Sequence, residues 1–423
     1  MSVNWEQKAL ELGRIFKPST PVKGNLFFGR QKQVRSVVDA INQEGQHVVL
    51  YGERGVGKTS LAKQLFSRLT SVSGAAVVIP HINCDSVDTY SSVWRKIFGE
   101  ITTINERETI GFSTETIRQL GTLADNVQGD ITPDTVLKQL SKIGRQFLLA
   151  VVVDEFDTIE DKAVRRQFAD TIKTCSDRGA PVTIVMIGVS EDVESLIEGH
   201  SSVERCLAQV RMPRMSRSEL DEILECSKSM EVIFDGKAKD EITGLSKGLP
   251  HYTHLLGLHA GRVALDSESL LVGQPNVRAA MKTAITSAQH SIMNAYHIAT
   301  LSSQKTATHK QVLLACAMAN TDELGYFSPV DVTEPLNLVM KKQQKIENFS
   351  KKIAVFCKGQ RGDIFARLKT THSQRFKYRF RNPLMQPYVI MRGIDENLID
   401  DTKLDFSRPS KGSQMGLFND FEV

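Results

Sequence analysis

One segment restricts the fold of this chain more than any other. Residues 52–59 read Gly-Glu-Arg-Gly-Val-Gly-Lys-Thr and match the phosphate-binding loop pattern G-x-x-x-x-G-K-[ST]. An apolar run at 47–51 precedes the segment, and a helical pattern over 58–68 follows it, which is the context that this loop requires. The sequence therefore predicts a strand, a tight loop and a helix in that order, with a nucleoside triphosphate bound at the loop.

Each fixed position of this pattern has a physical role. Glycines let the backbone turn tightly, so that several N–H groups point at phosphate oxygens, and the start of the helix adds partial positive charge. Lys58 is expected to reach the β- and γ-phosphates of ATP, and the Thr59 hydroxyl to ligate Mg²⁺. The predicted nucleotide-binding residues of the loop are Gly52, Gly55, Val56, Gly57, Lys58, Thr59 and Ser60.

A second apolar run, at 147–153, ends in two carboxylates, Asp154 and Glu155, as in a Walker B motif. Ligands of open α/β sheets bind beyond the carboxyl ends of the strands, so these side chains are expected close to the loop. Asp154 is the second predicted Mg²⁺ residue and is expected to hold the ion through water, and Glu155 is the predicted residue that positions and polarises the attacking water. The alternative is that the two carboxylates cap the helix that follows Thr158.

Two further polar residues are catalytic candidates. Ser190 follows an apolar run at 182–187 and is the candidate sensor of the γ-phosphate, although the same position also suits a helix cap. Arg205 precedes the next β-rich run and is the candidate arginine finger, which would enter the site of a neighbouring subunit. The alternative for Arg205 is an ion pair with a local carboxylate.

The order of the patterns predicts an α/β fold. Between residue 31 and about 214, helices alternate with short β-rich runs, which is typical of a parallel sheet covered by helices on both faces. The polar, Thr-rich segment 103–132 is interpreted as an insertion. The predicted divisions are a lead-in (1–30), a P-loop NTPase core (31–214), an all-helical lid (215–301), a winged-helix domain (309–396) and a flexible tail (397–423).

Composition excludes several classes of protein. The 6 cysteines are scattered without C-x-x-C spacing, which indicates reduced thiols and predicts neither a disulfide framework nor a zinc site. The longest apolar stretch, 147–153, is too short to cross a bilayer, and the first residues lack the apolar core of a signal peptide. The expected location is therefore the cytoplasm, with no membrane partner.

Positive charge gathers in the last third of the chain. Between residues 341 and 392 the only acidic residues are Glu347 and Asp363, against many lysines and arginines. Helical patterns followed by two strand-like runs, at 363–368 and 374–380, give the order of a winged helix, and such a basic footprint suits a phosphate backbone. The predicted DNA-binding residues are Arg367, Lys369, Arg375, Lys377 and Arg379. The alternatives are a solvated charged face and a protein-docking module.

The C-terminal tail contains a short motif. Residues 414–418 read Gln-Met-Gly-Leu-Phe and resemble the bacterial sliding-clamp-binding motif, in which Leu417 and Phe418 would fill an apolar pocket and Gln414 would hydrogen-bond at its rim. The competing interpretation is that these apolar residues dock onto the protein itself or onto another partner.

Several of these features together resemble the AAA+ and STAND ATPases, in particular bacterial relatives of the origin-recognition initiator family. The resemblance covers about residues 25–395 and implies that Gly29 and Arg30 lie near the adenine and that Pro250 of the lid closes over the base. The chain departs from the family where a lid helix usually begins with a sensor arginine, because Gly248-Leu249-Pro250-His251 stands there, closer to the STAND pattern.

Three functions are compatible with this sequence. The first is an ATP-binding and ATP-hydrolysing switch that acts on DNA through a winged helix and assembles into homo-oligomers. The second is a STAND-type regulatory ATPase that controls a partner effector protein in a phage-defence or mobile-element module. The third is a transposition-regulator ATPase that coats DNA as a filament.

Overall fold

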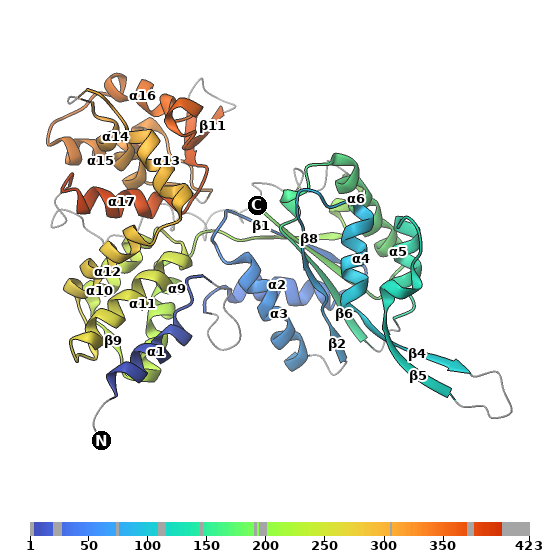
Figure 1. Cartoon of the computed structure of the whole chain (residues 1–423). Helices are drawn as coiled ribbons and strands as arrows, with labels where there is room; N and C mark the ends of the chain where they lie inside the picture. Colours follow the sequence, from blue (N-terminus) through green and yellow to red (C-terminus); the bar gives the residue numbers. More distant parts are fainter. Residues whose placement is uncertain are drawn as a thin grey trace, which may run out of the picture. The chain divides into compact units, whose positions relative to one another are not determined.

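The computed structural model describes residues 4–19, 28–72, 76–108, 116–143, 147–189, 193, 201–304, 307–322, 324–369 and 376–399. The chain divides into two compact units (Figure 1). The core unit contains the described residues of Val22–Glu53 and Gly57–Met212, and the C-terminal unit those of Met1–Pro21, Arg54–Val56 and Pro213–Val423.

A parallel sheet forms the centre of the core unit. Its strands follow the order β2-β6-β7-β1-β8, and β3 pairs with β6 beyond the end of β2. Every pairing in this sheet is parallel, so the carboxyl ends of the strands lie at one edge, and β1 lies between β7 and β8. This arrangement confirms the predicted P-loop NTPase fold. The strands are β1 (His47–Tyr51), β2 (Ala76–Val78), β3 (His81–Asn83), β6 (Phe147–Asp154), β7 (Thr183–Gly188) and β8 (Leu207–Arg211).

Helices cover both faces of the sheet. On one face lie α2 and α3, and on the other α4, α5 and α6 (Figure 1). Trp94 of α4 stacks on Phe168 of α6 with ring centroids 5.9 Å apart, and both rings are fully buried. These large rings anchor the core beneath the strand ends that carry the site. The elements are α2 (Gln31–Ile41), α3 (Lys58–Val72), α4 (Tyr90–Glu100), α5 (Pro133–Leu140), α6 (Lys162–Asp177) and α8 (Ser201–Glu204), with short 3₁₀ turns η2 (Leu123–Asn126) and η3 (Phe156–Thr158).

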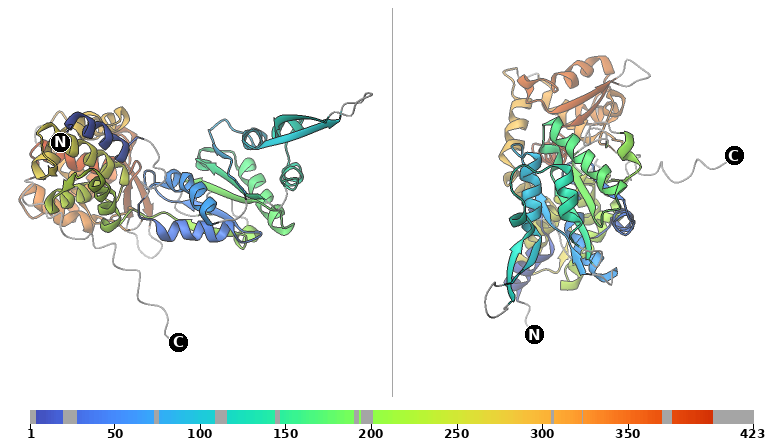
Figure 2. Two further views of the ribbon diagram at one scale, coloured as in Figure 1. Left: turned by 90° about the horizontal axis from the view of Figure 1, so that it is seen from below. Right: turned by 90° about the vertical axis from the view of Figure 1, so that its right-hand side faces the viewer.

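The segment interpreted as an insertion contains a β-hairpin. Strand β4 (Thr102–Glu108) pairs antiparallel with β5 (Thr116–Thr122), with Thr102 opposite Thr122. The hairpin lies outside the six-stranded sheet and projects from the core unit (Figure 2).

Helices dominate the first part of the C-terminal unit: α1 (Trp5–Ile15), α9 (Arg217–Glu225), η4 (Cys226–Met230), α10 (Gly236–Ser246), α11 (Pro250–Asp266), α12 (Gln274–Thr286) and α13 (His290–Thr300). The predicted lid also contains one parallel pair of two-residue strands, β9 (Ile233–Phe234) and β10 (Leu271–Val272), so it is not all-helical. The pairing follows from two short β-rich stretches brought together by the helices around them.

The lead-in helix α1 packs against α11. A Cβ atom at Gly261 would lie 2.5 Å from Leu12, and one at Gly257 would lie 2.9 Å from Phe16, so the two glycines admit these side chains. The Phe16 ring also meets Phe234 edge to face, with centroids 6.0 Å apart. Burial of Leu12 and Phe16 makes α1 an integral part of this unit.

The next elements follow the predicted order of helices and then two strands: α14 (His309–Met318), α15 (Pro329–Met340), α16 (Ile346–Val355), η5 (Gly359–Arg361) and the antiparallel strands β11 (Phe365–Lys369) and β12 (Phe376–Phe380). The helix α17 (Met385–Asp395), which the sequence patterns did not predict, follows the hairpin. Phe327, Phe365 and Phe380 pack edge to face beneath the hairpin. Among the helices within the described ranges, none is both long and apolar enough to span a membrane.

Candidate nucleotide-binding site

The loop after β1 has the backbone that its glycines permit. Gly52 and Gly57 adopt φ angles of 150° and 97°, which side chains rarely tolerate. A Cβ atom at Gly52 would lie 2.4 Å from the carbonyl oxygen of Met212, whereas nothing lies within 4 Å of one at Gly57. Gly52 is therefore required for space and conformation, and Gly57 for conformation alone.

Lys58 is the first residue of α3, and its ammonium group is held at the loop. Its Nζ donates to the carbonyl oxygens of Gly52 and Glu53, at 2.9 and 2.8 Å. The side chain is largely buried, so this positive charge acts with little screening by water. Thr59 and Ser60 follow in the first turn of α3, and Val56 lies within the loop.

Asp154, the last residue of β6, meets the loop helix. Burial by itself raises the pKa of Asp154, but hydrogen bonds from His81, from the Thr59 hydroxyl and from the backbone N–H of Glu155 lower it, and the net shift is downward. The carboxyl group is therefore ionised at neutral pH. The Thr59 hydroxyl and the Asp154 carboxylate, predicted from separate motifs, are direct neighbours.

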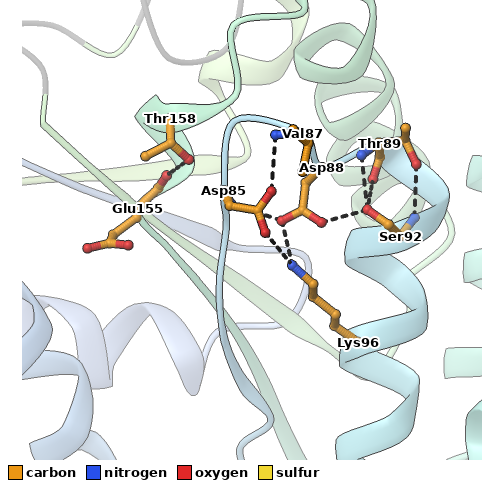
Figure 3. Close-up of polar contacts among 8 residues, drawn as sticks. All are labelled: Asp85, Val87, Asp88, Thr89, Ser92, Lys96, Glu155 and Thr158. Atoms are coloured by element: carbon orange, nitrogen blue, oxygen red, sulfur yellow. Dashed lines mark hydrogen bonds and ion pairs between the residues drawn. The ribbon is translucent and has the colours of Figure 1, made fainter.

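Glu155, directly after β6, has an unusual backbone conformation. Its φ angle is 56°, in the left-handed region that is costly for a residue with a side chain. Its N–H donates to Oδ1 of Asp154 at 2.9 Å. Its carbonyl oxygen accepts from the Thr158 hydroxyl at 2.8 Å, a contact drawn in Figure 3. The carboxylate is exposed and makes no hydrogen bond or ion pair with any residue that the structure describes.

The alternative that these carboxylates cap the following helix is wrong. Helix α6 begins at Lys162, and its N-cap is Asp161, whose side chain accepts from the N–H of Ala163 at 2.8 Å. Asp154 and Glu155 thus lie too far upstream to cap α6. Asp157 instead accepts from the N–H of Val189 at 2.8 Å and so links the chain after β6 to the end of β7.

Other predicted nucleotide-site residues are distributed over both units. Gly29 and Arg30 precede α2 with φ angles of 66° and 62°, and Arg30 is buried. Pro250 is the first residue of α11, in the C-terminal unit. Arg205 forms an ion pair with Asp177 at 2.9 Å, and its side chain is 70% exposed. Ser190 lies outside the described residues.

The predicted DNA-binding side chains make several contacts within the C-terminal unit. The Arg367 guanidinium lies 4.3 Å from the centre of the Phe376 ring, and that of Arg379 lies 5.0 Å from the centre of the Tyr326 ring. Lys377 pairs with Asp322 at 2.9 Å, whereas Lys369 is exposed. Arg375 and the tail residues Gln414, Leu417 and Phe418 lie outside the described residues.

Two features of the site are absent from the sequence predictions. His81 of β3 lies 3.4 Å from Asp154, and a polar network follows the same strand (Figure 3). In that network Asp88 accepts from Lys96 and from the Ser92 hydroxyl, both at 2.6 Å. Burial raises the pKa of Asp88, but the hydrogen bonds from Lys96 and Ser92 outweigh it and the pKa is lowered. A sequence signal for these residues did exist. Polar residues follow Ile82, and such a change marks the end of a strand, as it does at Asp154.

Comparison with known solved structures finds broad but weak similarity. The chain matches Cdc6p from Pyrobaculum aerophilum at 13% identity, over 91% of this chain and 98% of that one, with a TM-score of 0.45. The ORC1 protein of Aeropyrum pernix in complex with DNA matches at 15% identity, over 90% of this chain and 96% of that one, with a TM-score of 0.46. The Walker-type ATPase of Pyrococcus abyssi matches at 12% identity, over 89% of this chain and 99% of that one, with a TM-score of 0.49. Similarity at this level decides no function. No curated protein matches the chain.

The family comparison agrees with the geometry of the loop and strand ends. Residues 26–186 match the family described as the AAA ATPase domain. The matched range contains Lys58, Thr59, Asp154 and Glu155. The chain therefore carries an AAA ATPase domain over residues 26–186.

Proposed function

We propose that this protein is a Mg²⁺-dependent ATPase that works as a conformational switch on DNA. The observation that carries the nucleotide part is the direct contact between the Thr59 hydroxyl and the Asp154 carboxylate, together with the Lys58 ammonium group held at the loop by the Gly52 carbonyl oxygen. Hydroxyl and carboxylate oxygens are the ligands that Mg²⁺ prefers, and Mg²⁺ commonly uses one or two protein ligands together with phosphate oxygens. The residues present therefore fit this ion.

The chain's own groups divide the work of hydrolysis. The N–H groups of the loop and Lys58 bind and orient the phosphates, and Thr59 and Asp154 would hold the ion. Mg²⁺, when bound, neutralises charge on the phosphate oxygens. The exposed Glu155 carboxylate accepts a hydrogen bond from the attacking water and orients it in line with the γ-phosphate. Positioning and charge stabilisation supply most of the catalysis in this class of reaction.

The DNA part of the proposal is supported by exposed cations on the C-terminal unit. Lys341 and Lys342 follow the end of α15, Lys345 precedes α16, and Lys351 lies on α16; all four are exposed. None of these four lysines forms an ion pair with a residue that the structure describes. Such a row suits a phosphate backbone, which positions a protein without specifying a sequence.

The second candidate function is regulation of a partner effector protein, as in STAND-type ATPases. The charge of Lys377 is offset by its ion pair with Asp322, which reduces what this hairpin offers to DNA and favours protein docking. The guanidinium groups of Arg367 and Arg379 lie over the Phe376 and Tyr326 rings and keep their charge. A filament-forming transposition regulator and clamp binding by Gln414, Leu417 and Phe418 stay predictions from the sequence.

Self-assembly is the remaining element of the proposal. Arg205 is the proposed arginine finger, and its ion pair with Asp177 is exposed. Ion pairs this exposed contribute little to stability, because water and salt screen them, so exchanging Asp177 for a neighbour's phosphate costs little. Sedimentation with and without a non-hydrolysable ATP analogue tests this: assembly that appears with the analogue and is lost in Arg205→Ala is expected.

The central experiment measures phosphate release by the purified protein with and without duplex DNA. The proposal expects Mg²⁺-dependent release that DNA stimulates, and DNA affinity that falls steeply with salt. The effector function would be favoured instead if DNA leaves the rate of phosphate release unchanged and the protein forms a stable complex with another protein that survives nuclease treatment.

A further inference from the structure

The side chain of His81 reaches the Walker B aspartate across two paired strands. Strand β3 pairs with β6 so that His81 lies opposite Val152 and Asn83 opposite Asp154. The His81 Nε2 atom nevertheless lies 3.4 Å from Oδ2 of Asp154. The side chains are 18% and 3% exposed, so water competes little for this contact.

The donors around Asp154 reach different parts of its carboxylate. The N–H of Glu155 binds Oδ1 at 2.9 Å, His81 binds Oδ2, and the Thr59 hydroxyl donates to the same carboxylate. An ionised carboxylate can only accept hydrogen bonds, so the His81 ring must carry hydrogen on Nε2. The backbone N–H of Glu155 and the His81 ring thus fix the carboxylate from two sides. Of the three donor groups, only the Thr59 hydroxyl also has an oxygen atom that can bind a metal.

We propose that His81 is a positioning residue that orients the Asp154 carboxylate for Mg²⁺ binding. The inference rests on the proposed Mg²⁺-dependent nucleotide binding. A ligating carboxylate that lacks its outer hydrogen bonds can rotate, and loss of such a partner typically costs about 10–100-fold in metal affinity. His81 does not touch the phosphates in this role, so it acts only through Asp154.

The test compares nucleotide binding in Mg²⁺ and in EDTA, with a fluorescent N-methylanthraniloyl ATP as the probe. His81→Phe keeps a ring and removes the donor. We expect the Mg²⁺ concentration for half-maximal binding to rise about tenfold in this variant, with affinity in EDTA unchanged. His81→Gln keeps a donor and should recover part of the effect, and His297→Phe, an exposed histidine of α13, is the matched control.

Each outcome decides between roles. A wild-type Mg²⁺ dependence in folded His81→Phe overturns the inference. Equal loss of affinity in Mg²⁺ and in EDTA also overturns it, because it assigns His81 to packing alone. If His81→Phe does not fold, His81→Leu, which also removes the donor, takes its place once its thermal stability is shown to be normal. A raised Mg²⁺ requirement with unchanged affinity in EDTA then supports the inference, and a wild-type Mg²⁺ requirement overturns it. Wild-type binding that ignores Mg²⁺ overturns the proposed function itself, and the inference with it.

Discussion

The Nζ atom of Lys58 lies 2.9 Å from the carbonyl oxygen of Gly52, six residues earlier in the chain. This contact joins the first residue of α3 to the first residue of the loop and holds the ammonium group where a phosphate would be bound. Two of the acceptors that hold this charge are backbone carbonyl oxygens of the loop itself.

Replacing Lys58 should therefore affect nucleotide binding more than folding. Lys58→Ala removes the charge that meets the phosphates, and we expect ATP affinity to fall at least about tenfold, which corresponds to ~1.4 kcal/mol. Isothermal titration calorimetry measures it, and Lys63→Ala on the same helix is the control. ATP affinity equal to wild type in Lys58→Ala would contradict this site.

Glu155→Gln should separate binding from hydrolysis. The amide keeps the size of the side chain but accepts a proton poorly, so we expect the rate of phosphate release to fall about 10²–10⁴-fold while ATP binding stays within a factor of two or so. Glu160→Gln, an exposed residue in the following loop, should leave both unchanged. A hydrolysis rate near wild type in Glu155→Gln would remove Glu155 from the reaction.

Gly52→Ala should destabilise the core unit. The added Cβ would lie 2.4 Å from the Met212 carbonyl oxygen, and the φ angle of 150° disfavours alanine. We expect a loss of about 1–3 kcal/mol in the free energy of unfolding, measured in urea. Gly99 lies in α4 with nothing within 4 Å of an added Cβ, so Gly99→Ala should stabilise by about 0.5–1 kcal/mol. Equal effects of the two substitutions would refute the steric argument.

Acid should destabilise the core unit through His47. Burial lowers the pKa of His47 to about 4, against about 6.5 for an exposed histidine. The unfolded chain therefore binds a proton as the pH falls below 6.5 and the folded chain does not, so stability is lost between pH 6.5 and 4 and changes little below that range. The loss reaches up to about 3 kcal/mol.

The measurement is the unfolding free energy as a function of pH. His47→Gln should be less stable than wild type at pH 7.5, because His47 Nδ1 accepts the N–H of Ile184 at 3.0 Å, but its stability should depend less on pH between 6.5 and 4. His254, whose pKa is also lowered to about 4 by burial, provides a second contribution in the C-terminal unit. An unaltered pH profile in His47→Gln would contradict this assignment.

The exposed lysines around α15 should contribute to DNA affinity in a salt-dependent way. Replacing Lys341 and Lys342 by Gln removes two potential phosphate contacts, so the slope of log affinity against log salt should become shallower by about 2. Replacing Lys237 and Lys282, which are exposed elsewhere in the same unit, removes equal charge and should leave the slope unchanged. Equal effects of the two pairs would indicate attraction by net charge alone.

The phosphate-binding loop and the strand ends of the core could be predicted because each is specified by a short stretch of neighbouring residues. The glycine spacing of 52–59 specifies a backbone path, and each apolar run that ends in polar residues specifies a strand end. In a parallel sheet these ends share one edge, so the proximity of Thr59 and Asp154 followed from the order of the elements. The helix-capping alternative for Asp154 and Glu155 failed because the chain runs on to Asp161 before α6 begins.

Other relationships depended on tertiary structure. The contact of His81 with Asp154 requires the register of β3 on β6, in which His81 lies opposite Val152. The packing of Leu12 and Phe16 against Gly261 and Gly257 of α11 joins segments far apart in the chain. A pattern of residues states which face of an element is apolar, but not which distant element covers it, because that choice depends on how all buried surfaces fit together.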